Sequence, residues 1–582
     1  MDADAASIAD SDPMTVTAAS HRPLASAAPA PEHPTLCAAF GAAVRAHPDR
    51  LALRTPGDGV RVTWAEYFAR TQDVAARLAA LGVRHGDTVA LLLTTRPDAA
   101  WVDAAAMHLG ALGVSLYLAA DVAAHAYVLN DAEARLLVTE RALAPMVPEL
   151  RRRCQMLEHV LGIDGDAPGV TALESVDRRP GFDLKAAADA VDADDRVTLM
   201  YTSGTTGAPK GTVYTHRQVL TAFACLDAAL VPPEDLATVA FIPFAHAGQR
   251  AIGHYRAMLR GASTTFCADL TELPAAVADA RPTSLFAPPA VWQRLAAGVH
   301  AVVDADPELR DAYTAALARV RHRRAGGPPF QLTPGEDRLL CAARARVGLD
   351  RLTEPYVSAA PSPPELLEDL HALGMPVINV YALTELPPIT VTRPDPADIG
   401  TAGRPLPGVE VDLGRDGEVL VRHPAASSGY HRQPARTAAL FATDGWAHTG
   451  DLGTFDPAGR LQLDGRRDER FATSFGTNVD PVLVETALKG TTALIAHACV
   501  IGAGRPFLVA LITLQSGTAS RDLLAAAVER VNAGLPATAR IARFLVLQDT
   551  WAAGGDELTP TLKLRRSAVH ARYAEQIEAL YR

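Results

Sequence analysis

The sequence predicts an α/β fold with largely parallel sheets, followed by a smaller α+β domain. Short apolar runs alternate with Ala-rich stretches of helical character along most of the chain. Such alternation is typical of parallel sheets whose faces are covered by helices. After Asp464 the pattern changes to short strands and then helices, which indicates a separate unit. The apolar runs are Thr88–Leu93, Leu136–Thr139, Leu236–Phe244, Ser284–Pro288 and Val377–Tyr381.

The spacing of apolar residues indicates the first helices. Leu36, Phe40 and Val44 fall on one helical stripe, and the stretch from Trp64 to Leu81 is amphipathic. Residues 322–336 combine Gly, Pro and polar side chains, which predicts a surface loop between two helices.

Composition narrows the classes of function. The chain has 582 residues, of which 48% are hydrophobic and 21% charged, and its formal net charge is −11. This acidic balance argues against nucleic-acid binding, and no apolar run is long enough for a transmembrane segment. The first residues lack the basic and apolar regions of a secretory signal, so we expect a cytoplasmic protein. Six scattered cysteines lack metal-ligand spacing and are expected to be reduced thiols: Cys37, Cys154, Cys225, Cys267, Cys341 and Cys499.

Lysine is rare in this chain. Of the 55 basic residues only four are lysines, Lys185, Lys210, Lys489 and Lys563, and the others are arginines. A lysine that persists against such a bias indicates a position where the planar guanidinium of arginine cannot replace a compact ammonium. Lys210 and Lys563 are the candidates for such a role, whereas Lys185 and Lys489 need no functional explanation.

A loop with the chemistry of a phosphate site follows a predicted strand at Val197–Tyr201. It reads YTSGTTGAPKG (201–211) and precedes a helix predicted to begin near His216. Glycines allow backbone N–H groups to converge on phosphate oxygens, hydroxyls add donors, and Lys210 supplies a mobile positive charge. The spacing is not that of a Walker loop, because no Ser or Thr follows the lysine. The remaining candidate phosphate ligands are Thr202, Ser203, Gly204, Thr205, Thr206 and Gly207.

This segment closely resembles the phosphate-binding signature of the adenylate-forming superfamily, which includes acyl-CoA synthetases, peptide-synthetase adenylation domains and luciferases. The resemblance spans about residues 36–582, and its most similar branch is that of the long-chain fatty-acyl-CoA synthetases, on the evidence of TPTLK and RPFLVALITL (505–514). Six further segments resemble the family's other motifs in the right order: FIPFAH (241–246), YALTE (381–385), GEVLVR (417–422), WAHTGDLG (446–453), GRRDERFATSFGTNVDP (465–481) and DELTPTLKLRR (556–566).

The resemblance implies a large N-terminal domain of several subdomains and a smaller, mobile α+β C-terminal domain. Residues 1–35, rich in Ala, Ser, Pro and Asp, are expected to form a disordered tail. Residues 36–464 then form the domain that binds ATP or AMP and the substrate. Residues 465–470 form the hinge, and residues 471–582 form the mobile domain.

The resemblance also implies roles around ATP. Thr384 would bind the α-phosphate, and Glu385, a hard oxygen ligand, would hold Mg²⁺. Tyr381 would stack on adenine. Asp451 would accept hydrogen bonds from both ribose hydroxyls, and Arg466 would support the ribose.

Three further roles concern the acid and the moving domain. His246 would stand beside the acid-binding pocket. Lys563 would stabilise the charge that develops between the attacking oxygen and the α-phosphate, as an electrostatic catalyst. Asp468 resembles the hinge residue about which the small domain rotates between the adenylation and transfer half-reactions.

The sequence departs from the family pattern in three loops. Ala382 replaces the glycine of YGxTE, and Ser358 stands in VSAAP (357–361) where glycine is typical. The loop that usually reads SGGKN in the fatty-acyl branch has Phe475 and Thr477 in place of a glycine and the lysine. The ring of Phe475 could obstruct the path by which the pantetheine arm of CoA reaches the adenylate.

These observations leave three functions open. The first is an ATP-dependent ligase that adenylates a fatty or aryl carboxylic acid and transfers it to CoA. The second is a natural-product enzyme whose acceptor is not CoA, such as an amide ligase, an enzyme that loads a carrier protein, or a diazotase that activates the oxyacid nitrite for attack by an aryl amine. The third, a regulator that only binds AMP or ATP, conflicts with the presence of Lys210, Lys563 and Glu385.

Overall fold

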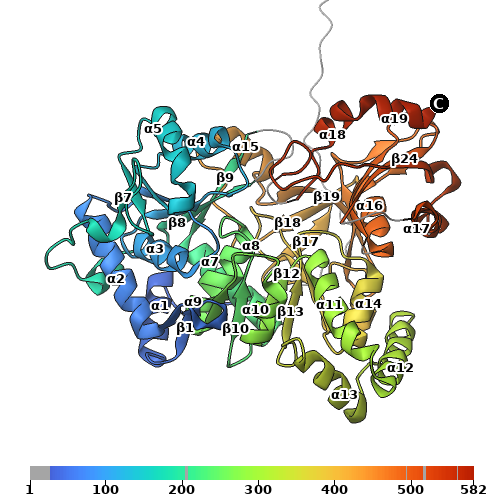
Figure 1. Cartoon of the computed structure of the whole chain (residues 1–582), viewed down its shortest axis with the longest axis horizontal. Coiled ribbons are helices and arrows are strands. Elements are labelled where there is room, and N and C mark those ends of the chain that lie inside the picture. Colours follow the sequence, from blue (N-terminus) through green and yellow to red (C-terminus); the bar gives the residue numbers. More distant parts are fainter. Residues whose placement is uncertain (1–26, 203–207, 493, 516–519, 560–561) are drawn as a thin grey trace, which may run out of the picture.

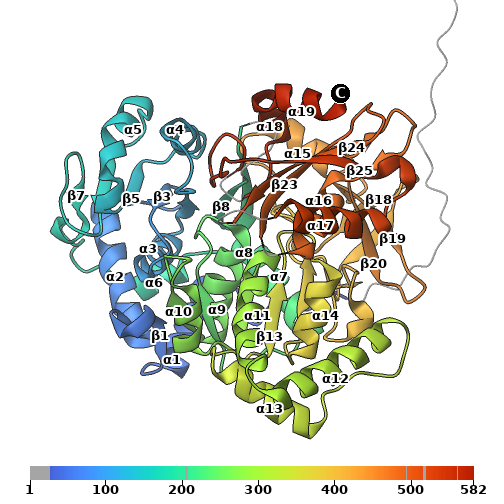
Figure 2. The same cartoon turned by 45° about the vertical axis from the view of Figure 1, so that its right-hand side comes forward.

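The computed structural model of the protein describes residues 27–202, 208–492, 494–515, 520–559 and 562–582. Figures 1 and 2 show a large domain, coloured from blue to orange, with a small red-orange domain against one side of it. This arrangement confirms the predicted α/β fold with a smaller C-terminal domain. Among the described residues, no helix is both long and apolar enough to cross a membrane.

The predicted tail is described only in part. Residues 1–26 lie outside the described residues, and residues 27–35 lie against the large domain. Ala28 packs next to Gly408, and a carboxylate oxygen of Glu32 lies 3.5 Å from Nη1 of Arg260. Thr35 then caps the first helix with its side chain.

A seven-stranded sheet forms one layer of the large domain. Its order is β7-β6-β5-β3-β4-β8-β9, and only β8 and β9 are antiparallel. The predicted strands at 88–93, 136–139 and 197–201 are confirmed as members of this sheet. Its strands and the helices between them are β3 (Thr88–Leu92), α3 (Pro97–His108), β4 (Leu112–Ser115), α4 (Val122–Asp131), β5 (Leu136–Thr139), α5 (Val147–Arg153), β6 (His159–Gly162), β7 (Thr171–Ala172), α6 (Leu184–Asp189), β8 (Arg196–Thr202) and β9 (Lys210–Thr215).

The sequence predicted a helix directly after the phosphate loop, but the structure has the strand β9 between them. Residues Lys210–Thr215 instead pair with β8, with Thr202 opposite Lys210. The helix α7 (His216–Ala229) begins where predicted, because Thr215 and Gln218 form a capping box that satisfies its first N–H groups.

A four-stranded sheet of order β10-β11-β1-β2 packs beside the first. The predicted helical stripes are confirmed in α1 and α2, whose rings of Phe40 and Tyr67 meet edge to face at 4.9 Å. The hydroxyl of Tyr67 donates to the carbonyl of Ala100 at 3.2 Å. This layer contains α1 (Leu36–Ala46), β1 (Leu51–Arg54), β2 (Arg61–Thr63), α2 (Trp64–Ala80), β10 (Ala237–Ala240), α8 (Ala247–Arg250), α9 (Arg256–Arg260), β11 (Ser263–Phe266) and α10 (Leu273–Ala280).

A five-stranded sheet of order β12-β13-β14-β15-β16 carries the next set of helices. The predicted loop at 322–336 is shorter than expected, because helices extend into both of its ends. The elements are β12 (Ser284–Ala287), α11 (Pro289–Val303), α12 (Pro307–Arg324), α13 (Pro334–Ala345), β13 (Glu354–Val357), α14 (Pro364–Ala372), β14 (Ile378–Tyr381), β15 (Thr390–Val391) and β16 (Arg404–Pro405).

An antiparallel sheet of order β17-β18-β19-β20 completes the large domain and leads into the small one. Its elements are β17 (Glu410–Leu413), β18 (Glu418–Arg422), α15 (Pro434–Leu440), β19 (Ala447–Phe455) and β20 (Leu461–Arg466).

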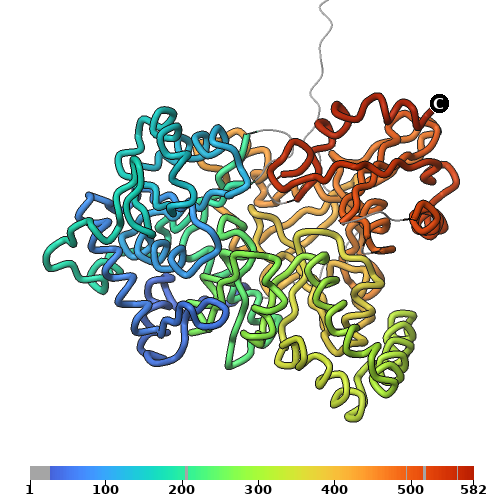
Figure 3. Tube along the Cα trace, viewed as in Figure 1, coloured from blue at the N-terminus to red at the C-terminus, as the bar shows by residue number. Residues whose placement is uncertain are grey.

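The small domain has a three-stranded sheet in which β23 and β24 are antiparallel and β24 and β25 parallel. The colour sequence of Figure 3 lets the chain be followed from this sheet to the C-terminal helices. The elements are β21 (Phe471–Ala472), β22 (Asn478–Val479), α16 (Pro481–Thr491), β23 (Ile495–Ile501), β24 (Leu508–Leu514), α17 (Arg521–Ala533), β25 (Ile541–Val546), α18 (Arg566–Arg572) and α19 (Ala574–Tyr581).

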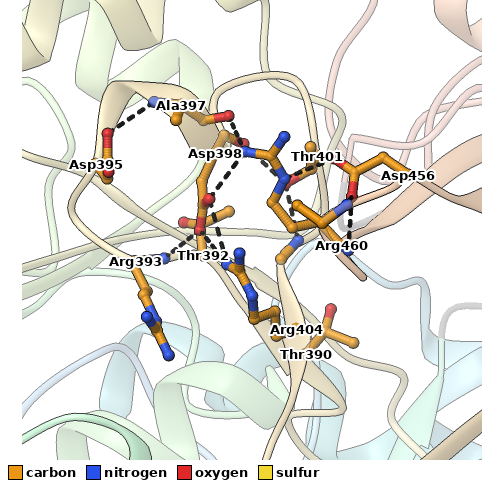
Figure 4. A network of polar contacts seen from close by, with 12 residues as sticks. Thr390, Thr392, Arg393, Asp395, Ala397, Asp398, Thr401, Arg404, Asp456 and Arg460 are labelled. Carbon is orange, nitrogen blue, oxygen red and sulfur yellow. Dashed lines mark hydrogen bonds and ion pairs between the residues drawn. The ribbon is translucent and has the colours of Figure 1, made fainter. Parts of the chain in front are cut away.

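A buried carboxylate, Asp398, joins the last two sheets of the large domain (Figure 4). It is 4% exposed and accepts from the backbone N–H of Arg393 at 2.9 Å. The guanidinium groups of Arg404 and Arg460 each lie 3.2 Å from it, and Arg460 also pairs with Asp456 at 2.6 Å. Since Arg404 belongs to β16 and Arg460 immediately precedes β20, these ion pairs fix the base of β20 to the five-stranded sheet.

We expect Asp398→Ala to lower the free energy of unfolding of the large domain by about 3 kcal/mol, because two partly buried guanidinium groups lose their carboxylate. A urea titration followed by tryptophan fluorescence measures this change. The control is Asp189→Ala, which removes an exposed ion pair with Lys185 and should change stability by less than about 0.5 kcal/mol. Equal effects of the two substitutions would contradict the role of Asp398.

Candidate functional site

Three of the predicted nucleotide ligands lie together where β14, β19 and β20 meet. The hydroxyl of Tyr381, the last residue of β14, donates to Oδ2 of Asp451 at 2.5 Å. Nη1 of Arg466 lies 3.4 Å from Oδ1 of the same carboxylate. Asp451 and Arg466 are direct partners in the β19–β20 ladder, so the strand register itself places the guanidinium beside the carboxylate.

Burial dominates the electrostatics of this group. Asp451 is 9% exposed, and burial raises its pKa above the ordinary value. The hydrogen bond from Tyr381 and the charges of Arg466 and Lys563 act in the opposite direction. Burial also raises the pKa of Tyr381 well above its ordinary range, so this side chain remains a hydroxyl donor. The carboxylate of Asp451 is therefore built to accept hydrogen bonds in a place that water barely reaches.

The predicted phosphate loop is described only at its two ends. Thr202 closes β8, Lys210 opens β9, and the predicted ligands Ser203, Gly204, Thr205, Thr206 and Gly207 lie outside the described residues. The ammonium of Lys210 stands 5.0 Å from the ring centroid of Tyr430, which is a cation–π distance.

Tyr430 also contacts the predicted magnesium ligand. Its hydroxyl donates to Oε1 of Glu385 at 2.5 Å. Burial raises the pKa of Tyr430, and the nearby carboxylate of Glu385 raises it further. The neighbouring Thr384 is held through its carbonyl, which accepts from the hydroxyl of Tyr214 on β9 at 2.9 Å. The structure thus brings Lys210, Thr384 and Glu385 together around two tyrosines.

Tyr430 is a site residue that the sequence analysis missed. The segment 427–431 runs along β9, where the N–H of His431 donates to Gly211 at 2.7 Å and that of Val213 donates to Gly429 at 3.0 Å. This pairing spans more than two hundred residues of chain, so no local pattern could reveal it. The only signal was a tyrosine between the sixth motif and the ribose motif.

Glu385 fits the role of a magnesium ligand. Its Oε2 accepts no hydrogen bond from the described part of the chain, which leaves a carboxylate oxygen for a hard cation. Among the described residues, no three His, Cys, Asp or Glu side chains form a metal cluster. This donor set suits Mg²⁺, which is usually bound through one or two carboxylates, with phosphate oxygens and water completing the shell.

His246 caps the short helix α8 and faces aromatic surroundings. Its Nδ1 accepts from the N–H of Gly248 at 3.1 Å, and its ring lies 6.3 Å from that of Phe286. Burial and the charge of Lys563 lower the pKa of His246 to about 4. The imidazole is therefore neutral at pH 7, and Nδ1 is engaged as an acceptor.

Lys563 reaches this site from the small domain. Its positive charge opposes the rise in the pKa of Asp451, the predicted ribose ligand, and helps to lower the pKa of His246. Its backbone is fixed by Thr559, whose N–H donates to the carbonyl of Lys563 at 2.8 Å and whose hydroxyl accepts from its N–H at 3.0 Å. Asp468, the predicted hinge residue, accepts from Nε of Arg466 at 3.1 Å.

The loop that departs from the family pattern is adapted locally. The hydroxyl of Ser358 donates to the carbonyl of Val380 at 2.8 Å, a contact that glycine could not make. The following Ala359 has φ +72°, a conformation that costs a residue with Cβ of the order of 1 kcal/mol. The altered loop is thus tied to β14, next to Tyr381.

Comparisons with known proteins identify the family of this chain. The sequence pattern of the AMP-binding enzyme family matches residues 40–431, and that of the AMP-binding enzyme C-terminal domain matches residues 468–582. The long-chain-fatty-acid–CoA ligase FadD15 of Mycobacterium bovis is 32% identical over 593 residues, which cover 94% of this chain and 97% of the relative.

Two solved structures share the fold. The anthranilate CoA ligase AuaEII in complex with anthranoyl-AMP has a TM-score of 0.72 at 20% identity, covering 94% of this chain and 98% of that one. The adenylation domain of the carboxylic acid reductase from Segniliparus rugosus, in complex with AMP and a carboxylic acid, has a TM-score of 0.73 at 20% identity, with 94% of both chains covered.

This chain belongs to the AMP-binding enzyme family. Within that family it is an AMP-forming ligase of the acyl-CoA synthetase type, as the resemblance in its sequence predicted.

The contact between Tyr430 and Glu385 yields a prediction. We expect Tyr430→Phe to raise the Mg²⁺ concentration that gives half-maximal pyrophosphate release about 10-fold, because outer partners orient metal-binding carboxylates. The control is Tyr313→Phe, which removes a similar hydrogen bond, to Asp369 at 2.7 Å, elsewhere in the large domain. An unchanged Mg²⁺ dependence in Tyr430→Phe would show that Glu385 does not need this hydroxyl.

Proposed function

We propose that this enzyme activates a carboxylic acid, fatty or aryl, as its adenylate and transfers the acyl group to CoA. The observation that carries the proposal is the contact of Tyr381 and Arg466 with the buried carboxylate of Asp451, on which the charge of Lys563 acts from the small domain. The same charge also acts on His246, beside the predicted acid pocket. The name of the long-chain-fatty-acid–CoA ligase relative and the anthranoyl-AMP and AMP complexes of the structural neighbours support the same reaction.

In the first half-reaction, a carboxylate oxygen of the acid attacks the α-phosphorus of ATP. The bond from the α-phosphorus to the bridging oxygen breaks, and pyrophosphate leaves with the electron pair. Lys563 offsets the negative charge that develops between the attacking oxygen and the α-phosphate. Lys210 neutralises the outer phosphates, and Thr384 holds the α-phosphate, so the protein acts by charge and position without a nucleophile of its own.

The nucleotide is held at the other end of the site. Tyr381 packs on adenine, Asp451 accepts from the ribose hydroxyls, and the charge of Arg466 favours the ionised form of that carboxylate. Glu385 would hold Mg²⁺, which would supply charge neutralisation at the phosphates.

In the second half-reaction, the small domain rotates about Asp468 and the thiol of CoA attacks the acyl carbon. The bond to AMP breaks, so that acyl-CoA and AMP form and one proton is released.

A second candidate has an amine in place of CoA as acceptor. Phe475 lies at the turn between β21 and β22 and is 67% exposed, which is unusual for a phenylalanine. The hydroxyl of Thr477 is engaged with that of Thr538 at 2.7 Å. The turn therefore presents an aromatic ring where the fatty-acyl branch has glycine, and it lacks the lysine. Acceptors of this candidate include the aryl amine of an ATP-dependent diazotase, with nitrite as the activated oxyacid.

We expect Lys563→Ala to slow adenylate formation about 10²–10⁴-fold while ATP binding stays nearly intact, since this charge acts on the transition state. Pyrophosphate release and ATP titration measure the two effects across fatty acids, aryl acids, and nitrite with aryl amines. Lys563→Arg should also lose most activity, because the guanidinium fork does not fit a point-charge position. Lys185→Ala, on the exposed surface, is the control, and normal pyrophosphate release by Lys563→Ala would refute the assignment.

One experiment separates the two acceptors. For a CoA ligase, CoA accelerates turnover of the unmodified enzyme and acyl-CoA accumulates. For an amine acceptor, CoA leaves turnover unchanged, and Phe475→Gly combined with Thr477→Lys gains CoA-dependent thioester formation because the ring no longer fills the path. Phe455→Ala, at another partly exposed phenylalanine, is the matched control. Efficient acyl-CoA production by the unmodified enzyme would exclude the blocked path.

A further inference from the structure

The loop that leads to Lys563 touches the large domain through a glycine. Gly554 lies between β25 and α18, and its φ of +75° is one that residues with a side chain rarely adopt. A Cβ at this position would lie 2.7 Å from the carbonyl carbon and 2.9 Å from the Cβ of Ala119, and would overlap the carbonyl oxygen. Ala119 belongs to the connection between β4 and α4. Figures 1 and 2 both show the red loop reaching toward α4.

A second glycine of the small domain meets the large domain elsewhere. Gly490 lies near the end of α16, and a Cβ there would lie 2.9 Å from Cβ and 3.0 Å from Cγ of Pro363. Pro363 immediately precedes α14. The two contacts use different elements in both domains. A body held at one point can still turn about that point. The two contacts together therefore restrict rotation of the small domain.

The described residues on either side of Lys563 are bonded to one another and to α16. Glu557, three residues after Gly554, accepts through its carbonyl from the N–H of Arg565 at 2.8 Å, and Leu558 and Leu564 form a bridge across the same turn. Arg566 donates to both carboxylate oxygens of the buried Glu485 at 2.6 and 2.8 Å. Because Glu485 lies on α16, this ion pair joins the turn of Lys563 to the helix that bears Gly490.

We infer that the contact of Gly554 with Ala119 positions the small domain for adenylate formation and has no part in the transfer step. The inference rests on the proposed function, in which Lys563 is needed near Asp451 only while the α-phosphate is attacked. A side chain at position 554 would push the loop away from Ala119. A displacement of about 1 Å in a catalytic group can cost 10²-fold in rate. Gly554 is therefore a positioning residue that acts through Lys563.

The kinetic test separates the two half-reactions of Gly554→Ala. The first is followed as pyrophosphate release in a single turnover, and the second as product formed from a pre-formed acyl-adenylate and CoA. We expect the first to fall by about 10- to 100-fold and the second to stay within about two-fold. Gly555→Ala is the matched control, because its Cβ would meet only its own loop, at 3.1 Å from the carbonyl oxygen of Ala552. Equal losses in both steps, or no loss, would overturn the inference.

A structural readout keeps the test independent of the acid substrate. Spin labels at Val231→Cys on the large domain and Leu523→Cys on α17 report the distance between the domains, since both side chains are exposed. Cys341→Ser removes the one native thiol of the described chain that is partly exposed. With ATP bound, we expect one dominant distance between the labels in the protein that carries Gly554. In Gly554→Ala, we expect fewer molecules to show that distance. An unchanged distance distribution would overturn the inference. A failure to find any adenylated acid would instead refute the proposed function alone.

Discussion

The site is arranged around one carboxylate that water hardly reaches, that of Asp451. A buried carboxylate is costly unless donors and positive charges surround it, and here each comes from a different part of the chain. The hydroxyl of Tyr381 comes from β14, the guanidinium of Arg466 from β20, and the charge of Lys563 from the small domain. The requirement to satisfy Asp451 therefore couples the five-stranded sheet, the antiparallel sheet and the small domain.

Sequence reasoning predicted the architecture, which is confirmed, from patterns local to the chain, and it predicted the site residues from the resemblance to a family. Apolar runs of strand length marked β3, β5 and β8, and the hydroxyl and glycine content of 201–211 marked a phosphate loop. The strand β9 was missed because Pro209, just before it, and Gly211, its second residue, are typical of a loop. The backbone partners on its outer edge, residues 427–431, are too distant to leave a local signal.

The remaining features required coordinates for a physical reason. The role of Tyr430 depends on where its hydroxyl lies relative to Glu385. A single tyrosine in a sequence does not indicate that position. Likewise Gly554 has the appearance of an ordinary loop glycine, since the atom that explains it belongs to Ala119, more than four hundred residues earlier. Contacts between domains depend on shape, and the sequence of either partner alone does not determine them.

The ion pairs of Asp398 have a consequence for the order of events in catalysis. They anchor the base of β20 to the large domain, while the chain toward the small domain continues from the other end of that strand, past Arg466. In the proposed reaction, a rotation about Asp468 leaves Asp451 and Arg466 where they were. The proposed ribose ligands then keep their places while Lys563 departs, so the adenylate stays on the large domain. Escape of the adenylate into solvent is thereby opposed at the moment when the site is most open.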